Sequence, residues 1–64
     1  MRYMILVQKA GTVVKTDFER AAEKLARKVN EAIHDGWKPQ GGIAVGKSAA
    51  TEIPYLMQAM VKLE

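Results

Sequence analysis

Residues 16–37 read TDFERAAEKLARKVNEAIHDGW, and this stretch decides the fold. Apolar residues recur in it at steps of four, three, four and four, the spacing of one helical stripe, at Phe18, Ala22, Leu25, Val29 and Ile33. Before the stripe, Thr16 and Glu19 have the spacing of a capping box. After it, Gly36 is the residue type that most often ends a helix. The stretch therefore predicts one amphipathic helix.

Three short apolar segments around this helix predict strands. The first covers residues 2–8, where β-branched and aromatic side chains are frequent. The second covers 43–45 and follows a tight connector at 38–42, and the third covers 55–63. Residues 13–14, both valine, fit either a short strand extension or an ordered loop.

The order strand, helix, strand, strand predicts the α+β class. We expect a single small domain over residues 1–64, with a three-stranded sheet and one helix packed on one face. A right-handed crossover through the helix would make the first two strands parallel. The small polar loop at 46–52 suits a hairpin. The third strand is therefore expected in the centre, antiparallel to both neighbours.

The size of the chain predicts association. A domain of 64 residues buries only about 60% of the surface that its unfolded chain exposes, so its core needs a supplement. With no cysteine and one histidine, His34, disulfides, thiolate metal sites and a histidine-based site within one protomer are excluded. A second chain is the supplement that remains. The lack of cysteine also fits a reducing cytoplasm.

Both faces of the predicted sheet are apolar, although one helix can cover only one of them. Alternate residues of a strand (one parity) point to the same face of the sheet. One parity of the two long strands presents Met4, Leu6, Leu56 and Met60, and the other presents Ile5, Val7, Met57, Ala59 and Val61. The uncovered face would be too large an apolar patch for a monomer, so we expect a homodimer. The pattern does not say which parity faces the helix. The first set, with Trp37, is the candidate interaction surface.

The outer face of the helix carries four basic residues, Arg20, Lys24, Arg27 and Lys28. Glu23 and Glu31 interrupt them. These cations could meet phosphates, so a weak nucleic-acid binder is the alternative function. Ten basic and seven acidic residues give a net charge of +3. Dedicated nucleic-acid binders of this size usually have a larger excess of basic over acidic residues. A solvated helix face is the simpler interpretation, and nucleic-acid binding is not favoured.

Residues 41–48, GGIAVGKS, match the pattern of a phosphate-binding loop. Such a loop follows a buried strand and opens a helix, whose first amide groups bind the phosphates. Here no strand is predicted before the glycines, and Pro54 comes soon after them. We therefore expect no nucleotide binding, and no role of that kind for Gly41, Lys47 and Ser48.

No catalytic arrangement is recognisable. General acid–base chemistry needs two poised titratable groups, and Asp17, His34 and Asp35 do not form such a set. His34 is expected as a cation near the helix C-terminus. Trp37 is expected to close the core at the helix end, with a partner contact as the alternative. Gln58, alone among apolar neighbours, suits a hydrogen bond within a strand interface or an edge position.

Residues 36–45, GWKPQGGIAV, resemble a family of small, mostly bacterial proteins known as domain of unknown function 1737. The likeness continues in Tyr55 and at 58–61, and more loosely in Tyr3 and the helix. The resemblance implies a compact cytosolic domain with the element order given above. It implies no activity, cofactor or site residue.

The expected function is therefore a non-catalytic, homo-oligomeric interaction module of the cytoplasm, without a cofactor. No stretch approaches the roughly 20 apolar residues that a membrane-spanning helix needs, so no membrane partner is expected.

Overall fold

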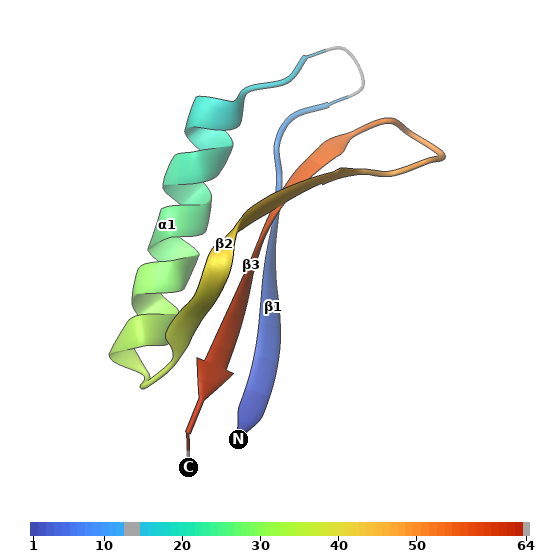
Figure 1. Cartoon of the computed structure of the whole chain (residues 1–64). Helices are drawn as coiled ribbons and strands as arrows, with labels where there is room; N and C mark the ends of the chain where they lie inside the picture. The colour runs from blue at the N-terminus through green and yellow to red at the C-terminus, as the bar shows by residue number, and fades with distance from the viewer. Residues whose placement is uncertain (13–14, 64) are drawn as a thin grey trace.

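The computed structural model describes residues 1–12 and 15–63 of the chain (Figure 1). They form the strand β1 (Arg2–Lys9), the helix α1 (Phe18–His34), the strand β2 (Lys38–Lys47) and the strand β3 (Pro54–Lys62). The predicted small α+β domain and its element order are confirmed. Val13 and Val14, for which two interpretations were left open, lie outside the described residues.

The three strands form one sheet in the order β1-β3-β2. β3 pairs antiparallel with both neighbours, so the predicted central position of the third strand is confirmed. The reason lies in the connections: a short turn lets β3 fold back directly against β2, whereas the helix carries the chain from one edge of the sheet to the other. β1 and β2 are therefore the two edges.

The helix begins one residue later than the capping-box spacing predicts. Asp17, not Thr16, is the N-cap, and its Oδ1 accepts a hydrogen bond from the backbone N–H of Arg20 at 3.0 Å. Thr16 instead forms an isolated bridge with Gly11. Aspartate and threonine both serve as N-caps, so the local pattern alone did not separate them.

The end of the helix follows the prediction. Gly36 has φ +95°, which is the left-handed conformation expected of it. The Trp37 N–H donates to Ala32 O at 2.9 Å, and the Gly36 N–H donates to Ile33 O at 3.0 Å. This pair of bonds is the Schellman motif, which satisfies two carbonyl groups that the last turn leaves free.

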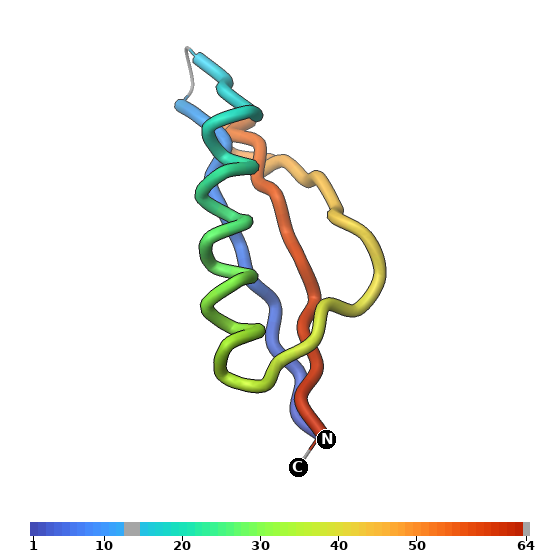
Figure 2. Tube along the Cα trace, turned by 90° about the vertical axis from the view of Figure 1, so that its left-hand side faces the viewer, coloured from blue at the N-terminus to red at the C-terminus, as the bar shows by residue number. Residues whose placement is uncertain are grey.

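β2 is longer than predicted. It includes Lys38–Gly42, which the glycines and Pro39 had suggested as a connector, and its pairing with β3 is irregular between Gln40 and Ala44. In Figure 2 its trace bows away from β3 over this part. An edge strand tolerates both features, because a proline there need not donate to a ladder and an irregularity has solvent on one side.

The helix packs on one face of the sheet (Figure 1). It packs more extensively against β1 and β3 than against β2, and Figure 2 shows it running alongside β1. Ala21, Leu25 and Ala32 are its buried residues, and the core cluster joins Ala21 and Leu25 to Ala10 and Leu56. The predicted stripe is thus rotated: Phe18 and Ile33 remain 47% and 46% exposed. Alanines occupy the line of closest approach because their small side chains let the helix lie near the sheet.

Candidate interaction surfaces

The four apolar residues first assigned to an interaction surface lie instead between the sheet and α1. Leu56 and Met60 are 6% and 0% exposed, and Leu6 packs against the core cluster. Met4 shares their parity and is half-buried. The prediction that Met4, Leu6, Leu56 and Met60 form an interaction surface is therefore wrong. Both parities are apolar, and only the docking of the helix decides which one is covered.

The opposite side of the sheet is an apolar surface, and no helix of the described residues covers it. On β1 it carries Tyr3, Ile5 and Val7, which are 44% to 61% exposed. Their register partners on β3 are Val61, Ala59 and Met57, each half-buried. Ala44 on β2 continues the row of Val7 and Met57. We call this set of seven residues on three strands the open face.

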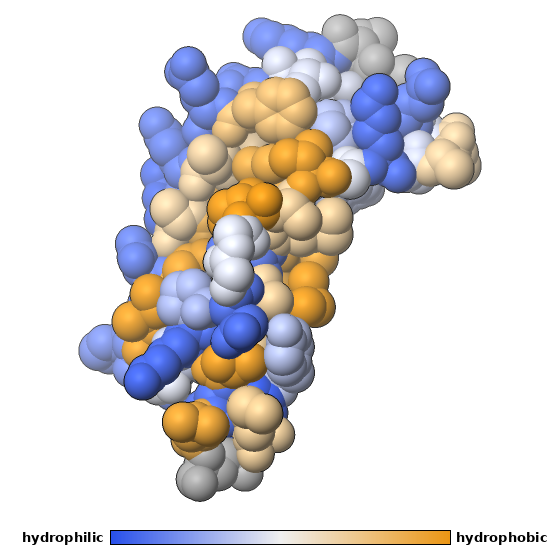
Figure 3. Space-filling view, viewed as in Figure 1, coloured by the Kyte–Doolittle hydropathy of each residue, from blue (hydrophilic) through white to orange (hydrophobic). Residues whose placement is uncertain are grey.

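A second apolar surface lies between α1 and β2. A shallow cavity of about 320 Å³ there is lined mainly by apolar side chains, among them Ala26, Val29 and Ile43. Figure 3 shows hydrophobic residues gathered over α1 and β2 on this side of the molecule. Ile43 and Val45 are 53% and 61% exposed, because the helix lies too far toward β1 to cover them.

Gln58 is the buried polar side chain of the described part of the chain, with 4% exposure. Its Nε2 donates to the carbonyl oxygens of Gln40 at 3.4 Å, Gly41 at 3.2 Å and Ala59 at 2.9 Å. Two of these acceptors belong to the irregular part of β2. Of the two roles considered for Gln58, the hydrogen bond between strands is the one that the structure has.

Trp37 is half-buried at the end of the molecule where the helix stops. Two cations lie against its ring: the Arg2 guanidinium carbon is 5.6 Å and the Lys62 Nζ 5.8 Å from the ring centroid. Arg2 and Lys62 are opposite each other on β1 and β3, so the indole joins the helix end to the sheet. A partner contact through Trp37 remains a prediction.

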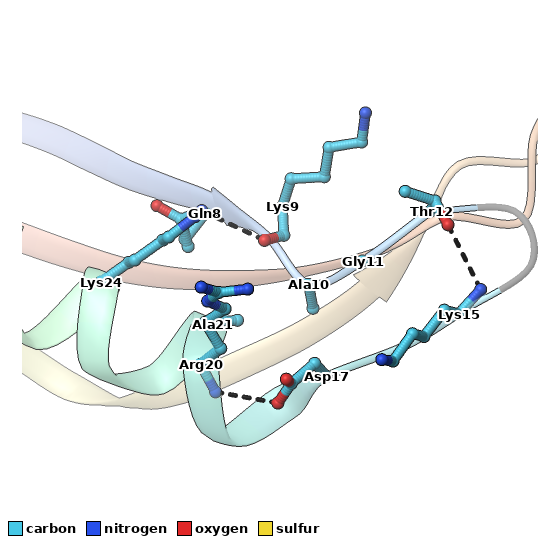
Figure 4. Close-up of a pocket in the computed structure, with 10 residues that line it drawn as sticks. All are labelled: Gln8, Lys9, Ala10, Gly11, Thr12, Lys15, Asp17, Arg20, Ala21 and Lys24. Carbon is cyan, nitrogen blue, oxygen red and sulfur yellow. Dashed lines mark hydrogen bonds between the residues drawn. The ribbon is translucent and has the colours of Figure 1, made fainter.

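The four cations of the helix do not form one continuous surface. Lys28 donates from Nζ to the carbonyl oxygen of Val7 at 2.9 Å and is thus held against the edge of β1. Arg20 and Lys24 line a cavity between the end of β1 and the start of α1, which Figure 4 shows. Arg27 does not line that cavity. All four are exposed.

The segment that matches the phosphate-loop pattern lies mostly in a strand, although its first residue, Gly41, has φ +75°. Gly41 to Lys47 belong to β2, and Ser48 begins the turn toward β3. A turn and then a strand follow the lysine where a nucleotide-binding loop would open a helix. The absence of nucleotide binding remains a prediction.

His34 lies exposed in the last turn of α1, as expected for a residue near the helix C-terminus. Within residues 1–12 and 15–63, no three histidine, aspartate or glutamate side chains gather into a group that could hold a metal ion. In the same described residues, no helix is long and apolar enough to cross a membrane.

The model of a protein family described as "Domain of unknown function (DUF1737)" matches residues 18–63, from the start of α1 to just beyond β3. The chain belongs to this family. No curated protein and no solved structure matched the chain. The DUF1737 model thus covers the helix, β2 and β3. The open face also includes residues of β1, which precedes the matched region.

Proposed function

We propose that this chain is a non-catalytic interaction module that works as a homo-oligomer, in the simplest case a two-fold dimer that buries the open face of each copy. The observation that carries the proposal is the row of Tyr3, Ile5 and Val7, which stand half exposed beside apolar side chains of β3. The proposal includes a cytosolic location in a bacterium, which the lack of cysteine and the family resemblance support.

The accessible surface area of the chain is larger than expected for a monomer of its mass, which supports the proposal of a partner. A folded monomer of 7.1 kDa is expected to expose about 4,100 Å². This chain exposes 4703 Å², roughly 600 Å² more than that scaling predicts. Each partner in a stable protein interface buries about 800 Å². The excess is therefore of the size that one such interface would remove.

The shape of the molecule explains the excess. Its principal extents are 42, 21 and 15 Å, so one helix on one sheet makes a thin slab. Met60 is the one large side chain with less than 2% exposure in the described residues. A second slab placed on the open face would convert the sheet from an outer layer into an inner one, which is how small domains gain the core that they lack.

The composition of the open face favours a second copy as the occupant. Its seven residues carry no charge, so an apolar surface is the complement that leaves no ion buried among them unpaired. Lys38, the register partner of Val61, stands exposed at one end of the face, where its ammonium group can remain in water. An isologous contact presents the same patch on both sides and therefore meets this requirement without any further partner.

Sedimentation equilibrium at micromolar concentration tests the proposal with a matched pair of variants. Ile5 on the open face and Ile43 beside the α1–β2 cavity are both 53% exposed. Ile5→Glu should give the mass of one 7.1 kDa chain, because a two-fold interface would bury two carboxylates, at several kcal/mol each. Ile43→Glu should keep at least twice that mass, like the unaltered protein.

Three results would contradict the proposal. An unaltered chain that sediments as a monomer and stays folded on dilution has no need of the partner. Dissociation by Ile43→Glu and not by Ile5→Glu would assign the interface to the α1–β2 side. Duplex DNA bound with an affinity that falls steeply with salt, by a chain that is monomeric, would favour the nucleic-acid alternative.

A further inference from the structure

The net charge of the chain is concentrated at the cavity between the end of β1 and the start of α1. Four of the ten basic residues line this cavity, and Asp17 is the one acidic residue among the seven that does. Six basic and six acidic residues remain for the rest of the chain. The formal net charge of +3 is therefore also that of the cavity lining. A recess with one dominant sign of charge concentrates ions of the opposite sign.

The cations reach the cavity from three segments. Lys9 ends β1, Lys15 precedes the helix, and Arg20 and Lys24 are four residues apart on α1. In Figure 4 the Arg20 and Lys24 side chains extend from the helix toward β1, and Lys15 extends from the opposite side, whereas Lys9 points away. Lys15, Arg20 and Lys24 are thus placed to contact an anion in the cavity, whereas Lys9 contributes only to the positive electrostatic potential there.

In the part of the chain that the structure describes, these cations have no carboxylate partner. Within the described residues, Lys15, Arg20 and Lys24 form no ion pair. The nearest acid in the lining, Asp17, is engaged as the N-cap and accepts from the Arg20 N–H. Like charges brought together without a counterion repel each other, so an anion in the cavity would stabilise this arrangement.

The cavity has room for a ligand because its buried lining residues are small. Ala10 and Ala21 are 1% and 2% exposed and leave a volume of about 430 Å³. That volume falls within the range of roughly 300–1,000 Å³ that small-molecule sites occupy. Two lining residues are joined by two bonds, from the Thr12 N–H to Lys15 O at 2.6 Å and from the Lys15 N–H to Thr12 Oγ1 at 3.2 Å.

We infer that this cavity binds a phosphate group, either as free phosphate or as the terminal group of a small phosphorylated molecule. The planar guanidinium of Arg20 can donate to two oxygens at once, and Lys15 and Lys24 supply compact positive charges. A dianion suits the excess of positive charge better than a single carboxylate would. A nucleic-acid track is not favoured, because Lys28 is held by Val7 O and Glu23 interrupts the basic residues.

The site is separate from the interface proposed above. Arg20 and Lys24 project from α1, on the side of the sheet opposite the open face. Phosphate binding is therefore expected whether the chain is a monomer or a dimer, and the two proposals can fail independently.

Amide chemical-shift titration of the full chain tests the inference, at constant ionic strength in a buffer without phosphate or sulfate. Inorganic phosphate and glycerol phosphate are added separately. Saturable shifts should centre on residues 8–12 and 15–24. Tighter binding of glycerol phosphate would identify a phosphorylated small molecule as the ligand class, and equal binding would identify the phosphate ion itself.

Four variants locate the contact. Arg20→Gln and Lys24→Gln should each weaken phosphate binding by about tenfold, the size of one lost charge-assisted hydrogen bond. Lys9→Gln removes a charge that points away, and Arg27→Gln removes one outside the cavity, so each should weaken binding less than about threefold. Equal losses in all four variants, no saturable shift, or tighter binding of a DNA duplex than of phosphate would overturn the inference.

Discussion

The side chain of Gln58 on β3 donates a hydrogen bond from Nε2 to the carbonyl oxygen of Gly41 on β2, at 3.2 Å. The same nitrogen lies 3.4 Å from Gln40 O and 2.9 Å from Ala59 O, so three acceptors share its two hydrogens. These bonds replace ladder bonds that the register shift between Gln40 and Ala44 interrupts. Gln58 thus holds β2 to the centre of the sheet where backbone pairing is irregular.

Gln58→Leu should destabilise the fold by about 1–3 kcal/mol, because it leaves the carbonyl groups of the irregular segment without their donor. Urea unfolding measures the loss. Gln8→Leu is the matched control. Among the described residues, the Gln8 amide bonds only to the adjacent Lys9 O, and its loss should cost less than about 0.5 kcal/mol. Equal effects of the two substitutions would show that Gln58 does not support β2.

Trp37→Ala should lower the free energy of unfolding by about 2 kcal/mol, less than the roughly 3 kcal/mol typical of a fully buried aromatic residue, since Trp37 is half-buried. Trp37→Phe should recover most of the loss, because a phenyl ring still offers a face to Arg2 and Lys62. Thermal melts compare the variants. An unchanged melting temperature with a lower sedimentation mass would instead place Trp37 in an interface.

Gly11→Ala should destabilise the chain by about 2 kcal/mol or more. Gly11 has φ +144°, and a Cβ there would collide with Lys15 O and lie 2.7 Å from the Cα of Thr16. Gly42→Ala is the matched control, since a Cβ at Gly42 has nothing within 4 Å. Chemical denaturation of the two variants should separate them clearly. A Gly11→Ala protein as stable as the Gly42→Ala protein would contradict the crowding at residues 15 and 16.

Calorimetry with Mg-ATP and Mg-GTP should give no binding signal that depends on Lys47, despite the match of residues 41–48 to a phosphate-binding loop. Residues 44–47 pair with β3 as part of the sheet, and a turn follows Lys47 in place of a helix. A micromolar signal that Lys47→Ala abolishes would refute this prediction. A weak signal that Arg20→Gln reduces would instead come from the basic cavity.

The elements and their order could be predicted because their signals are local. The helix from Phe18 to His34 has a repeating apolar spacing and a glycine at its end. The central place of β3 follows from the lengths of the connections. Boundaries were less certain: Asp17 and Thr16 are both good caps, and Pro39 and Gly41 are common in connectors, so the start of α1 and the length of β2 were misjudged.

The candidate site was predictable only in part. The two alternating apolar sets of β1 and β3 established that one face of the sheet would lack a helix. They could not identify that face, and Leu56 and Met60, which were predicted to lie on it, are buried. The basic cavity was missed as well, because Lys15 lies outside the helix and was not considered together with Arg20 and Lys24 of the basic helix face.

The sequence by itself thus determined the helix, the three strands and the presence of a second apolar sheet face, because periodicity and connection length act over short stretches of chain. The tertiary structure alone decided that α1 lies toward β1, that Tyr3, Ile5 and Val7 remain uncovered, and that Arg20 and Lys24 meet Lys15 across a cavity. These outcomes depend on where the helix docks. Its position is set by the packing of Ala21 and Leu25 against Leu56, a contact between residues far apart in the chain, which no local spacing encodes.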